Sequence, residues 1–294
     1  MRRFLPFLAL SFLALPAFAY RGHGLNVNIS TDDDEPLTRC DQIRATVDGE
    51  RLPVTEETLD AHGVRSLAVH TSKNGGVYVI GTDDGAYSVK ACKAAAFADV
   101  SSIRAGISGG TVTADGPDRS DWVVYFIVRA PRNASLDLSA YNGPIAVRDV
   151  VGTITAHTQN GPLSLKNTSG TIDASAVNGP VSFAGDSGDV KLRVQNGPLS
   201  VKLSSDFWGR GSLDASTENG PLSLKLPQNY RSGVLVETDG NGPVSCKAEA
   251  CRGVRAFRDD GDEDRYPRRI ELGSGAKVVH LSTTNGPLSI KERD

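Results

Sequence analysis

Residues 153–202 read TITAHTQNGPLSLKNTSGTIDASAVNGPVSFAGDSGDVKLRVQNGPLSVK, and Asn-Gly-Pro recurs in them every 18 residues. Along the whole chain the tripeptide begins at Asn142, Asn160, Asn178, Asn196, Asn219, Asn241 and Asn285. The intervals are 18, 18, 18, 23, 22 and 44 residues. A recurring period of this length is typical of repeat architectures. We expect the longest interval to hold one repeat that lost the motif, together with a loop.

Apolar and polar residues alternate on both sides of each tripeptide. The third and fifth residues after the Asn are apolar in every repeat, as at Leu163 and Leu165. The sixth and fourth residues before it are also apolar, except at Glu237, where we expect a bulge or a local opening. Period-two alternation predicts two half-buried strands per repeat. Proline cannot donate a ladder hydrogen bond, so Asn-Gly-Pro is interpreted as the corner between them.

Two architectures could use such strand pairs: an antiparallel meander of hairpins or a solenoid of stacked coils. The regular period and the like residues at equivalent positions favour the solenoid. Glycine also recurs at the opposite corner, at Gly152, Gly170, Gly188, Gly211 and Gly233. We therefore predict an all-β, single-stack parallel β-solenoid of about 18–22 residues per coil with an N-terminal β-rich cap. The column of Asn side chains is predicted to form an amide ladder.

Three stretches carry a resemblance to a known family. They are the repeated TxNGPLSLK, the segment WVVYFIVRAPRNASLDLSAYNGPIAV from Trp122, and the closing AKVVHLSTTNGPLSI. The pattern resembles the bacterial putative-adhesin family over about residues 65–294. This resemblance implies an exported β-solenoid whose molecular function is largely unassigned. It brings no catalytic motif.

The N-terminal residues predict export. Residues 1–19 combine the basic Arg2 and Arg3, a short apolar run and a closing Ala-Phe-Ala, which is typical of a signal peptide. No other stretch approaches the ~20 apolar residues of a transmembrane helix. We predict a location in the periplasm or at the cell surface.

The mature chain is divided by pattern. Residues 20–131 are assigned to the cap, within which Asn74-Gly75-Gly76 marks a degenerate coil and Ala91–Ala98 predicts a short helix. Residues 132–294 are assigned to the repeats, and residues 248–275 to a charged projecting loop.

Charge and cysteine content narrow the function further. Without Arg2 and Arg3 the chain has 30 basic and 35 acidic residues, which argues against a general nucleic-acid or anionic-membrane binder. Four cysteines in an oxidising compartment suggest up to two disulfides and allow three pairings. Cys40–Cys92 with Cys246–Cys251 is preferred, because each pair lies in its own region; buried free thiols are the alternative.

The sixth residue after each Asn is basic in six of seven repeats. These residues are Arg148, Lys166, Lys202, Lys225, Lys247 and Lys291, and Ala184 is the exception. With the Ser two residues earlier, they are predicted to share one outward face. The hypothesis is a face for a polyanion such as an acidic cell-surface or extracellular polysaccharide. The alternative is a soluble surface whose Lys stems cover apolar atoms. The oligomeric state is not set by the sequence.

Residue patterns for catalysis, metals and cofactors are weak. The five histidines share no spacing with a nucleophile or a metal partner. Asp260, Asp262 and Asp264 are interpreted as a solvated acidic loop. We predict no catalytic residue, metal or cofactor, and an exported cell-envelope adhesin or structural binding scaffold. The alternative is a carbohydrate-active enzyme, a polysaccharide lyase or hydrolase on a β-helix. Its carboxylates would come from the column Asp137, Asp173 and Asp214.

Overall fold

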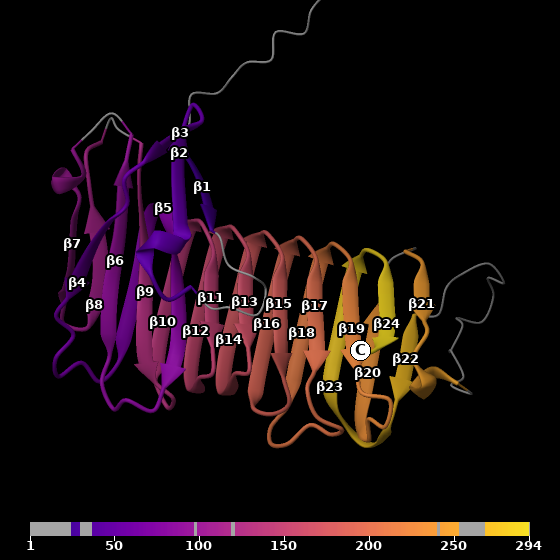
Figure 1. The fold of residues 1–294 in the computed structure, drawn as a ribbon. Helices are drawn as coiled ribbons and strands as arrows, with labels where there is room; N and C mark the ends of the chain where they lie inside the picture. Colours follow the sequence, from indigo (N-terminus) through magenta and orange to yellow (C-terminus); the bar gives the residue numbers. More distant parts are fainter. Residues whose placement is uncertain are drawn as a thin grey trace, which may run out of the picture.

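The computed structural model describes residues 25–29, 37–96, 99–118, 121–239, 242–252 and 268–293. These residues form an all-β structure whose main feature is a large, mostly parallel sheet (Figure 1). Its helical segments in the described ranges are three short 3₁₀ turns, η1 (Cys40–Gln42), η2 (Val100–Ser102) and η3 (Glu249–Cys251). No helix in these ranges is long and apolar enough to cross a membrane. The predicted signal peptide, Asn241 and the acidic loop at Asp260 lie outside the described residues.

Each repeat contributes a long strand that ends at the Asn and a short strand after the Pro. The long strands are β10 (Ser135–Asn142), β12 (Val151–Asn160), β14 (Ser169–Asn178), β16 (Asp189–Asn196), β18 (Leu213–Asn219) and β23 (Ser274–Asn285). The short strands are β11 (Ile145–Arg148), β13 (Leu163–Lys166), β15 (Val181–Gly185), β17 (Leu199–Leu203), β19 (Leu222–Leu226) and β24 (Leu288–Glu292).

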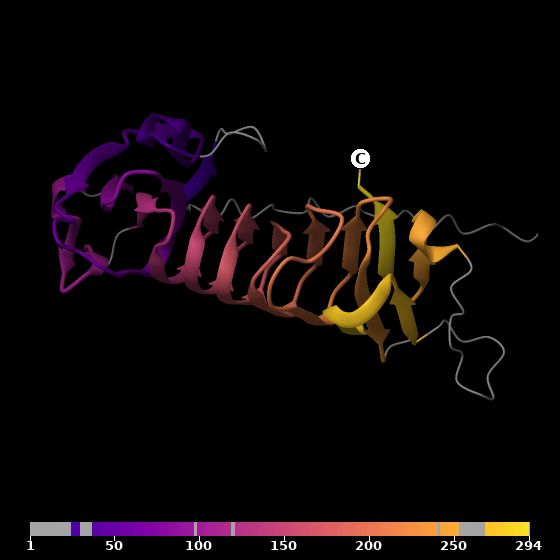
Figure 2. The same cartoon turned by 90° about the horizontal axis from the view of Figure 1, so that it is seen from below.

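Equivalent strands of neighbouring repeats pair in parallel. Ile154 lies opposite Ile172 in the long strands, and Leu163 lies opposite Val181 in the short ones. The result is two ladders, which we call the long-strand ladder and the short-strand ladder. The antiparallel meander is therefore excluded for the repeats. Both views show an elongated stack with the N-terminal strands at one end (Figures 1 and 2).

The core lies between the two ladders. Ile154 and Ile172 of the long strands and Leu163 and Leu165 of the short strands are each 1% exposed. They belong to one cluster of buried side chains that continues through the repeats. Period-two alternation therefore places the apolar residues inward, as predicted, and leaves the intervening polar residues on two outer faces.

The corners place Gly on Gly and Asn on Asn. A Cβ added at Gly161 would lie against the backbone carbonyl oxygen of Gly143, so that only glycine fits. The Nδ2 of Asn160 donates to the Oδ1 of Asn142 (3.0 Å), and the Nδ2 of Asn178 donates to the Oδ1 of Asn160 (2.9 Å). The same bond joins the other neighbours from Asn74 to Asn285 at 3.1–3.2 Å. The predicted amide ladder is confirmed.

The segment around Asn74, which is interpreted as a degenerate coil, belongs to both ladders. It lies in β5 (Leu67–Thr82), which pairs in parallel with β10 before the Asn and with β11 after it. Beyond β5, the short-strand ladder continues into β9 (Trp122–Pro131), then into the antiparallel β6 (Ser88–Ala95) and β4 (Thr55–Leu59). On the long-strand side, β8 (Thr111–Asp115) pairs with β5, and β7 (Arg104–Ser108) pairs with β8.

The helix predicted at Ala91–Ala98 is wrong. Ala91–Ala95 belong to strand β6, between β4 and β9, and these residues are buried. Alanine favours a helix locally, but small side chains also suit a strand that is covered on both faces. Tertiary packing therefore overrides the propensity.

A small antiparallel sheet covers the outer face of the ladder at this end. It consists of β1 (Leu25–Ile29), β2 (Ile43–Val47) and β3 (Glu50–Leu52). Its Ile43 and Ala45 pack with Val123 and Ile127 of β9 in a second buried cluster. A Cys40–Cys92 disulfide joins the segment before β2 to β6, and the remaining cysteines pair as Cys246–Cys251.

The repeat that comes last in the sequence does not lie at the end of the stack. Strands β23 and β24 of the Asn285 repeat pair with β18 and β19 on one side. On the other side they pair with β20 (Ser232–Thr238) and β21 (Val244–Cys246), which precede them in sequence. In Figure 1 the yellow strands accordingly lie between orange ones.

The expected motif-free repeat in the 44-residue interval is not found among the described residues. Part of that interval is β22 (Arg269–Leu272), antiparallel to β20. The prediction of a loop throughout residues 248–275 is therefore wrong for β22.

The exception at Glu237 is explained by register. Val234 and Val236 pair with Val279 and Leu281 and are fully buried, so that Glu237 faces outward. Thr238 pairs with Thr283 and Val244 with Leu288, so that a step of six residues faces a step of five. This extra residue offsets the strand by one from the alignment based on Asn241. The carboxylate of Glu237 lies 2.9 Å from Nε2 of His280.

Candidate functional site

The basic residues predicted from the repeat lie in one row on the outer face of the short-strand ladder. Strand register sets their order as Arg148, Lys166, Ala184, Lys202, Lys225 and Lys291. Lys247 follows the partner of Ile290 and continues the row beyond Lys291. We call this set the basic row. Parallel strands lie ~4.8 Å apart, so neighbouring positions in the row are separated by about that distance along the stack.

Serine hydroxyls run beside the basic row on the same strands. Ser164, Ser182 and Ser200 are consecutive partners across β13, β15 and β17. The Ser182 hydroxyl donates to the Ser164 hydroxyl at 3.1 Å. The outer face therefore offers hydroxyl groups and cations at the same spacing, as predicted from the Ser-x-Lys pattern.

A hollow of about 360 Å³ opens where the basic row is interrupted by Ala184. Lys166 and Lys202 stand on the two strands next to Ala184, and Lys225 stands on the strand beyond. The lining residues are Ser164, Leu165, Lys166, Asn167, Ser182, Phe183, Ala184, Ser200, Lys202, Ser204 and Lys225. Because Ala184 ends at Cβ, the space that a lysine stem would occupy in any other repeat is open.

The two outer faces of the stack differ in how their charges are satisfied. On the long-strand ladder, Arg193 pairs with Asp173 at 2.6 Å, and His280 lies between Asp214 (3.5 Å) and Glu237 (2.9 Å). On the basic row, no carboxylate among the described residues lies within ion-pair distance of Lys202, Lys225 or Lys291. Lys191 on the long-strand face is also without such a carboxylate among the described residues, but it stands alone there, whereas the short-strand face presents a row of such cations.

The small N-terminal sheet determines where this face begins. Tyr78 of β5 occupies the position that Ala146 and Ser164 hold in the next repeats, and its ring lies 6.2 Å from that of Tyr125. Both tyrosines are packed against the small sheet. Burial raises the pKa of Tyr125 to about 12 and also raises the pKa of Tyr78. Both phenols are therefore neutral at physiological pH, and the exposed Ser/Lys surface starts after them.

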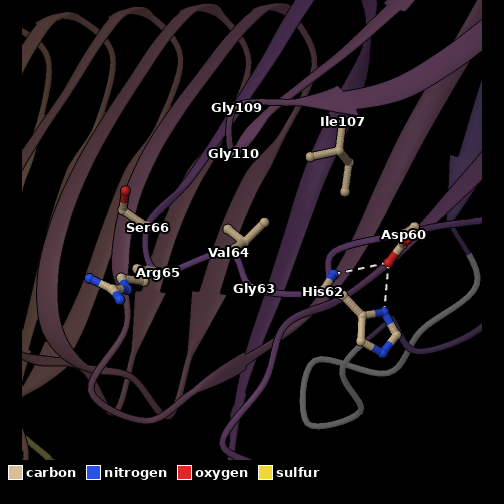
Figure 3. Close-up of a pocket in the computed structure, with 9 residues that line it drawn as sticks. All are labelled: Asp60, His62, Gly63, Val64, Arg65, Ser66, Ile107, Gly109 and Gly110. Carbon is tan, nitrogen blue, oxygen red and sulfur yellow. Dashed lines mark hydrogen bonds and ion pairs between the residues drawn. The ribbon is translucent and has the colours of Figure 1, made fainter.

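A second hollow, of about 400 Å³, lies where the chain enters β5 (Figure 3). Asp60 Oδ1 accepts from the His62 backbone N–H (3.0 Å) and lies 2.6 Å from His62 Nδ1. These bonds, the backbone one first, lower the pKa of the Asp60 carboxyl. Figure 3 shows Arg65 and Ser66 on the opposite side of the hollow. The His62 side chain is 99% exposed, so water competes with the pair, and no nucleophile among the described residues is hydrogen-bonded to it.

The acidic column of the alternative enzyme hypothesis is occupied by ion pairs. Asp137 lies 3.7 Å from His70, and Asp173 and Asp214 pair with Arg193 and His280. Thr155 and Lys191 separate the three aspartates along the ladder. The described ranges also contain no group of three or more His, Cys, Asp or Glu that could hold a metal ion.

Sequence reasoning missed two of these features. Ala184 stood out as the exception in the basic column, but a hollow does not follow from one small residue without the strand register. Asp60 and His62 are only two residues apart, a spacing at which a turn lets an aspartate accept from the backbone N–H. Ser204 lies at the rim of the first hollow. It belongs to the loop that lengthens the repeat from 18 to 23 residues.

Comparison with known proteins leaves the family open. No family model and no curated protein matches the sequence. Solved structures that resemble it include a putative cell adhesion protein from Clostridium sporogenes (TM-score 0.33, 9% identity, 82% of this chain and 100% of that one). A putative adhesin from Bacteroides fragilis (0.36, 11%, 82% and 97%) and a putative lipid binding protein from Parabacteroides distasonis (0.29, 9%, 82% and 97%) also resemble it. These scores are too low to carry an argument about function. The resemblance to adhesins stays a prediction.

Proposed function

We propose that the chain is an exported β-solenoid scaffold of the cell envelope that binds an anionic polymer, such as an acidic polysaccharide, along the basic row. The observation that supports this most directly is that the basic row places cations in register on neighbouring strands of one face. Lys202, Lys225 and Lys291 meet no carboxylate among the described residues, and they stand in one row, whereas on the long-strand face only Lys191 is left in this way and its neighbour Arg193 pairs with Asp173.

The spacing of the row favours an extended partner. Like charges on neighbouring strands repel one another, which costs a few tenths of a kcal/mol per pair at a surface. A polymer with regularly spaced anions removes this repulsion at several positions at once. The attraction is local, because the chain as a whole carries a net charge of −3. At physiological salt the Debye length is ~8 Å, so binding depends on close contact with the row.

Support for a non-enzymatic role comes from the acidic column of the long-strand ladder and not from the basic row. The three aspartates of the enzyme hypothesis are held in ion pairs and separated along the ladder. Export is supported by the two disulfides together with the signal-peptide pattern. Together these favour an adhesive or structural scaffold over a polysaccharide lyase or hydrolase.

The test is salt elution of the mature protein from immobilised heparin and immobilised polygalacturonate. We expect retention that weakens with salt, and elution at lower salt for the triple variant Lys166→Ser/Lys202→Ser/Lys225→Ser. The matched control, Lys191→Ser/Arg193→Ser/Arg210→Ser, removes the same charge away from the basic row and should elute like the parent. Equal elution of parent and triple variant would overturn the proposal. Shortening of either polymer during incubation would overturn the non-enzymatic assignment.

A further inference from the structure

We propose that the hollow at Ala184 is a subsite for one anionic sugar unit of the bound polymer, held by the lysines and serines around it. The inference rests on the proposed function and deepens it by naming a position and a ligand chemistry. Elsewhere the basic row offers cations and serine hydroxyls on an unbroken surface, whereas at Ala184 the same groups surround a hollow.

The cations come from both sides of the hollow. Lys166 and Lys202 are the strand partners of Ala184, so two strand spacings, ~9.6 Å, separate their backbones. Lys225 adds a third ammonium group on the side of Lys202. An anionic group above Ala184 can approach cations from both directions, and the missing lysine stem leaves room for it between them.

Neutral donors line the same space. Ser164, Ser182 and Ser200 present hydroxyls in register along one wall, while Asn167 and Ser204 stand at the corner end of the strands. A hydroxyl can donate or accept, so this wall suits the hydroxyl groups of a sugar ring as well as an anion. Ammonium groups alone would select for charge only.

Carbon surface completes the match to a sugar. The methyl group of Ala184 contributes to the lining, and lysine stems lie along apolar surface while their ammonium groups reach water. A pyranose ring presents C–H groups on its faces and hydroxyl or acidic groups at its edge. A bare inorganic anion would leave the carbon surface uncovered.

Buried aromatic side chains pack beneath the strand that forms the floor of the hollow. The aromatic ring of Phe183 is buried and lies 6.2 Å from that of Trp208. The indole Nε1 of Trp208 donates to the carbonyl oxygen of Gly188 at 3.2 Å. Trp208 belongs to the same lengthened loop as Ser204, so that the insertion which supports the floor also supplies part of the rim.

The experiment is isothermal titration of the mature protein at low salt with three tetrasaccharides. These are a galacturonate tetrasaccharide (carboxylate only), a heparin tetrasaccharide (sulfated) and neutral maltotetraose. We expect at least one anionic tetrasaccharide to bind and maltotetraose not to bind. The anionic tetrasaccharide that binds identifies whether carboxylate or sulfate is preferred.

Substitutions at Ala184 separate shape from charge. Ala184→Leu fills the hollow without changing charge and should weaken tetrasaccharide binding about tenfold or more, since the ring is excluded. Ala184→Lys completes the basic row but fills the same space, and should also weaken it. Thr155→Leu is the matched control on the opposite face and should leave binding unchanged. Far-ultraviolet circular dichroism and thermal midpoints verify that all three variants fold.

The outcomes distinguish this inference from the proposed function. Tighter tetrasaccharide binding by Ala184→Lys, or unchanged binding by Ala184→Leu, would overturn the subsite while polymer retention by the basic row stood. Binding of maltotetraose as tight as that of the anionic sugars would overturn it too. If the parent protein is not retained on the immobilised polymers, both the subsite and the proposed function are overturned.

Discussion

At the residue scale, the Asn-Gly-Pro corner combines a steric requirement with a hydrogen-bond requirement. Gly179 stacks on Gly161, and a Cβ added there would meet the carbonyl oxygen of Gly161. Asn178 donates to Asn160 and accepts from Asn196, at 2.9 and 3.1 Å. The glycine therefore lets neighbouring repeats approach, and the asparagine joins them by exposed side-chain bonds. The tripeptide is structural, and the residues of the proposed binding surface lie four and six positions beyond the Asn.

We expect Gly179→Ala to destabilise the protein more than Asn178→Ala does. The added methyl group forces the backbones of two repeats apart, at a cost of about 1–3 kcal/mol. Loss of the exposed amide costs ~1 kcal/mol, because water replaces its partners. Urea unfolding followed by circular dichroism measures both. Gly106→Ala is the control, since nothing lies within 4 Å of its added Cβ, and it should be near neutral. A smaller effect for Gly179→Ala than for Asn178→Ala would contradict the steric role.

At the element scale, the C-terminal repeat is placed by strand pairing and not by chain order. The apolar residues of β18, β20 and β23 are interchangeable in kind, so that sequence similarity allows β20 to stack on either β18 or β23. His280 of β23 lies between Asp214 of β18 and Glu237 of β20. The inserted strand thus provides a partner for a carboxylate on each neighbour.

Disulfide trapping checks this order. Ser216 of β18 and Ser282 of β23 are direct partners, so the double variant Ser216→Cys/Ser282→Cys should form a disulfide. Ser216→Cys/Glu237→Cys should not, because β23 lies between and places the two Cα atoms ~9.6 Å apart, beyond the ~7 Å limit for a disulfide. Peptide mapping by mass spectrometry measures both. If the repeats stacked in chain order, the second pair would be linked and the first would not.

At the scale of the whole molecule, the short-strand ladder divides into a covered and an open part. The small β1–β3 sheet covers the outer face of β6 and β9, and the Cys40–Cys92 disulfide holds it there. Beyond Tyr78 the same face is open and carries the basic row. One sheet therefore provides both the attachment surface for the N-terminal region and the proposed binding surface.

Removing each disulfide should have unequal effects. Cys40 and Cys92 are 52 residues apart, and Cys246 and Cys251 are 5 apart. Loop-closure entropy then predicts a loss of about 4 kcal/mol for Cys40→Ser/Cys92→Ser and about 2 kcal/mol for Cys246→Ser/Cys251→Ser. Chemical denaturation measures the totals. Hydrogen exchange should locate the first effect in β1–β3, and faster exchange confined to the repeats would contradict the attachment role.

Much of the repeat could be predicted from the sequence because its determinants are local and recur. Alternation at Leu163 and Leu165 gives the inward face, and glycine and asparagine at a fixed interval give the corner and the amide ladder. Lys166 and Lys202 are placed on one outward face by the two-residue period of a strand. Each of these features depends on neighbours that repeat the same residues.

The features that depend on contacts between segments of different sequence were decided only by the tertiary structure. The strand at Ala91–Ala95 exists because β4 and β9 cover it, against the local preference of alanine. The insertion of β23 and the outward position of Glu237 depend on which strand edge is filled, a choice that similar repeats leave open. The hollow at Ala184 needs three strands in register together with a loop from a later repeat. A periodic sequence determines the repeating unit, because its contacts are alike; the order of the units and the gaps in their surface are set only when unlike parts pack together.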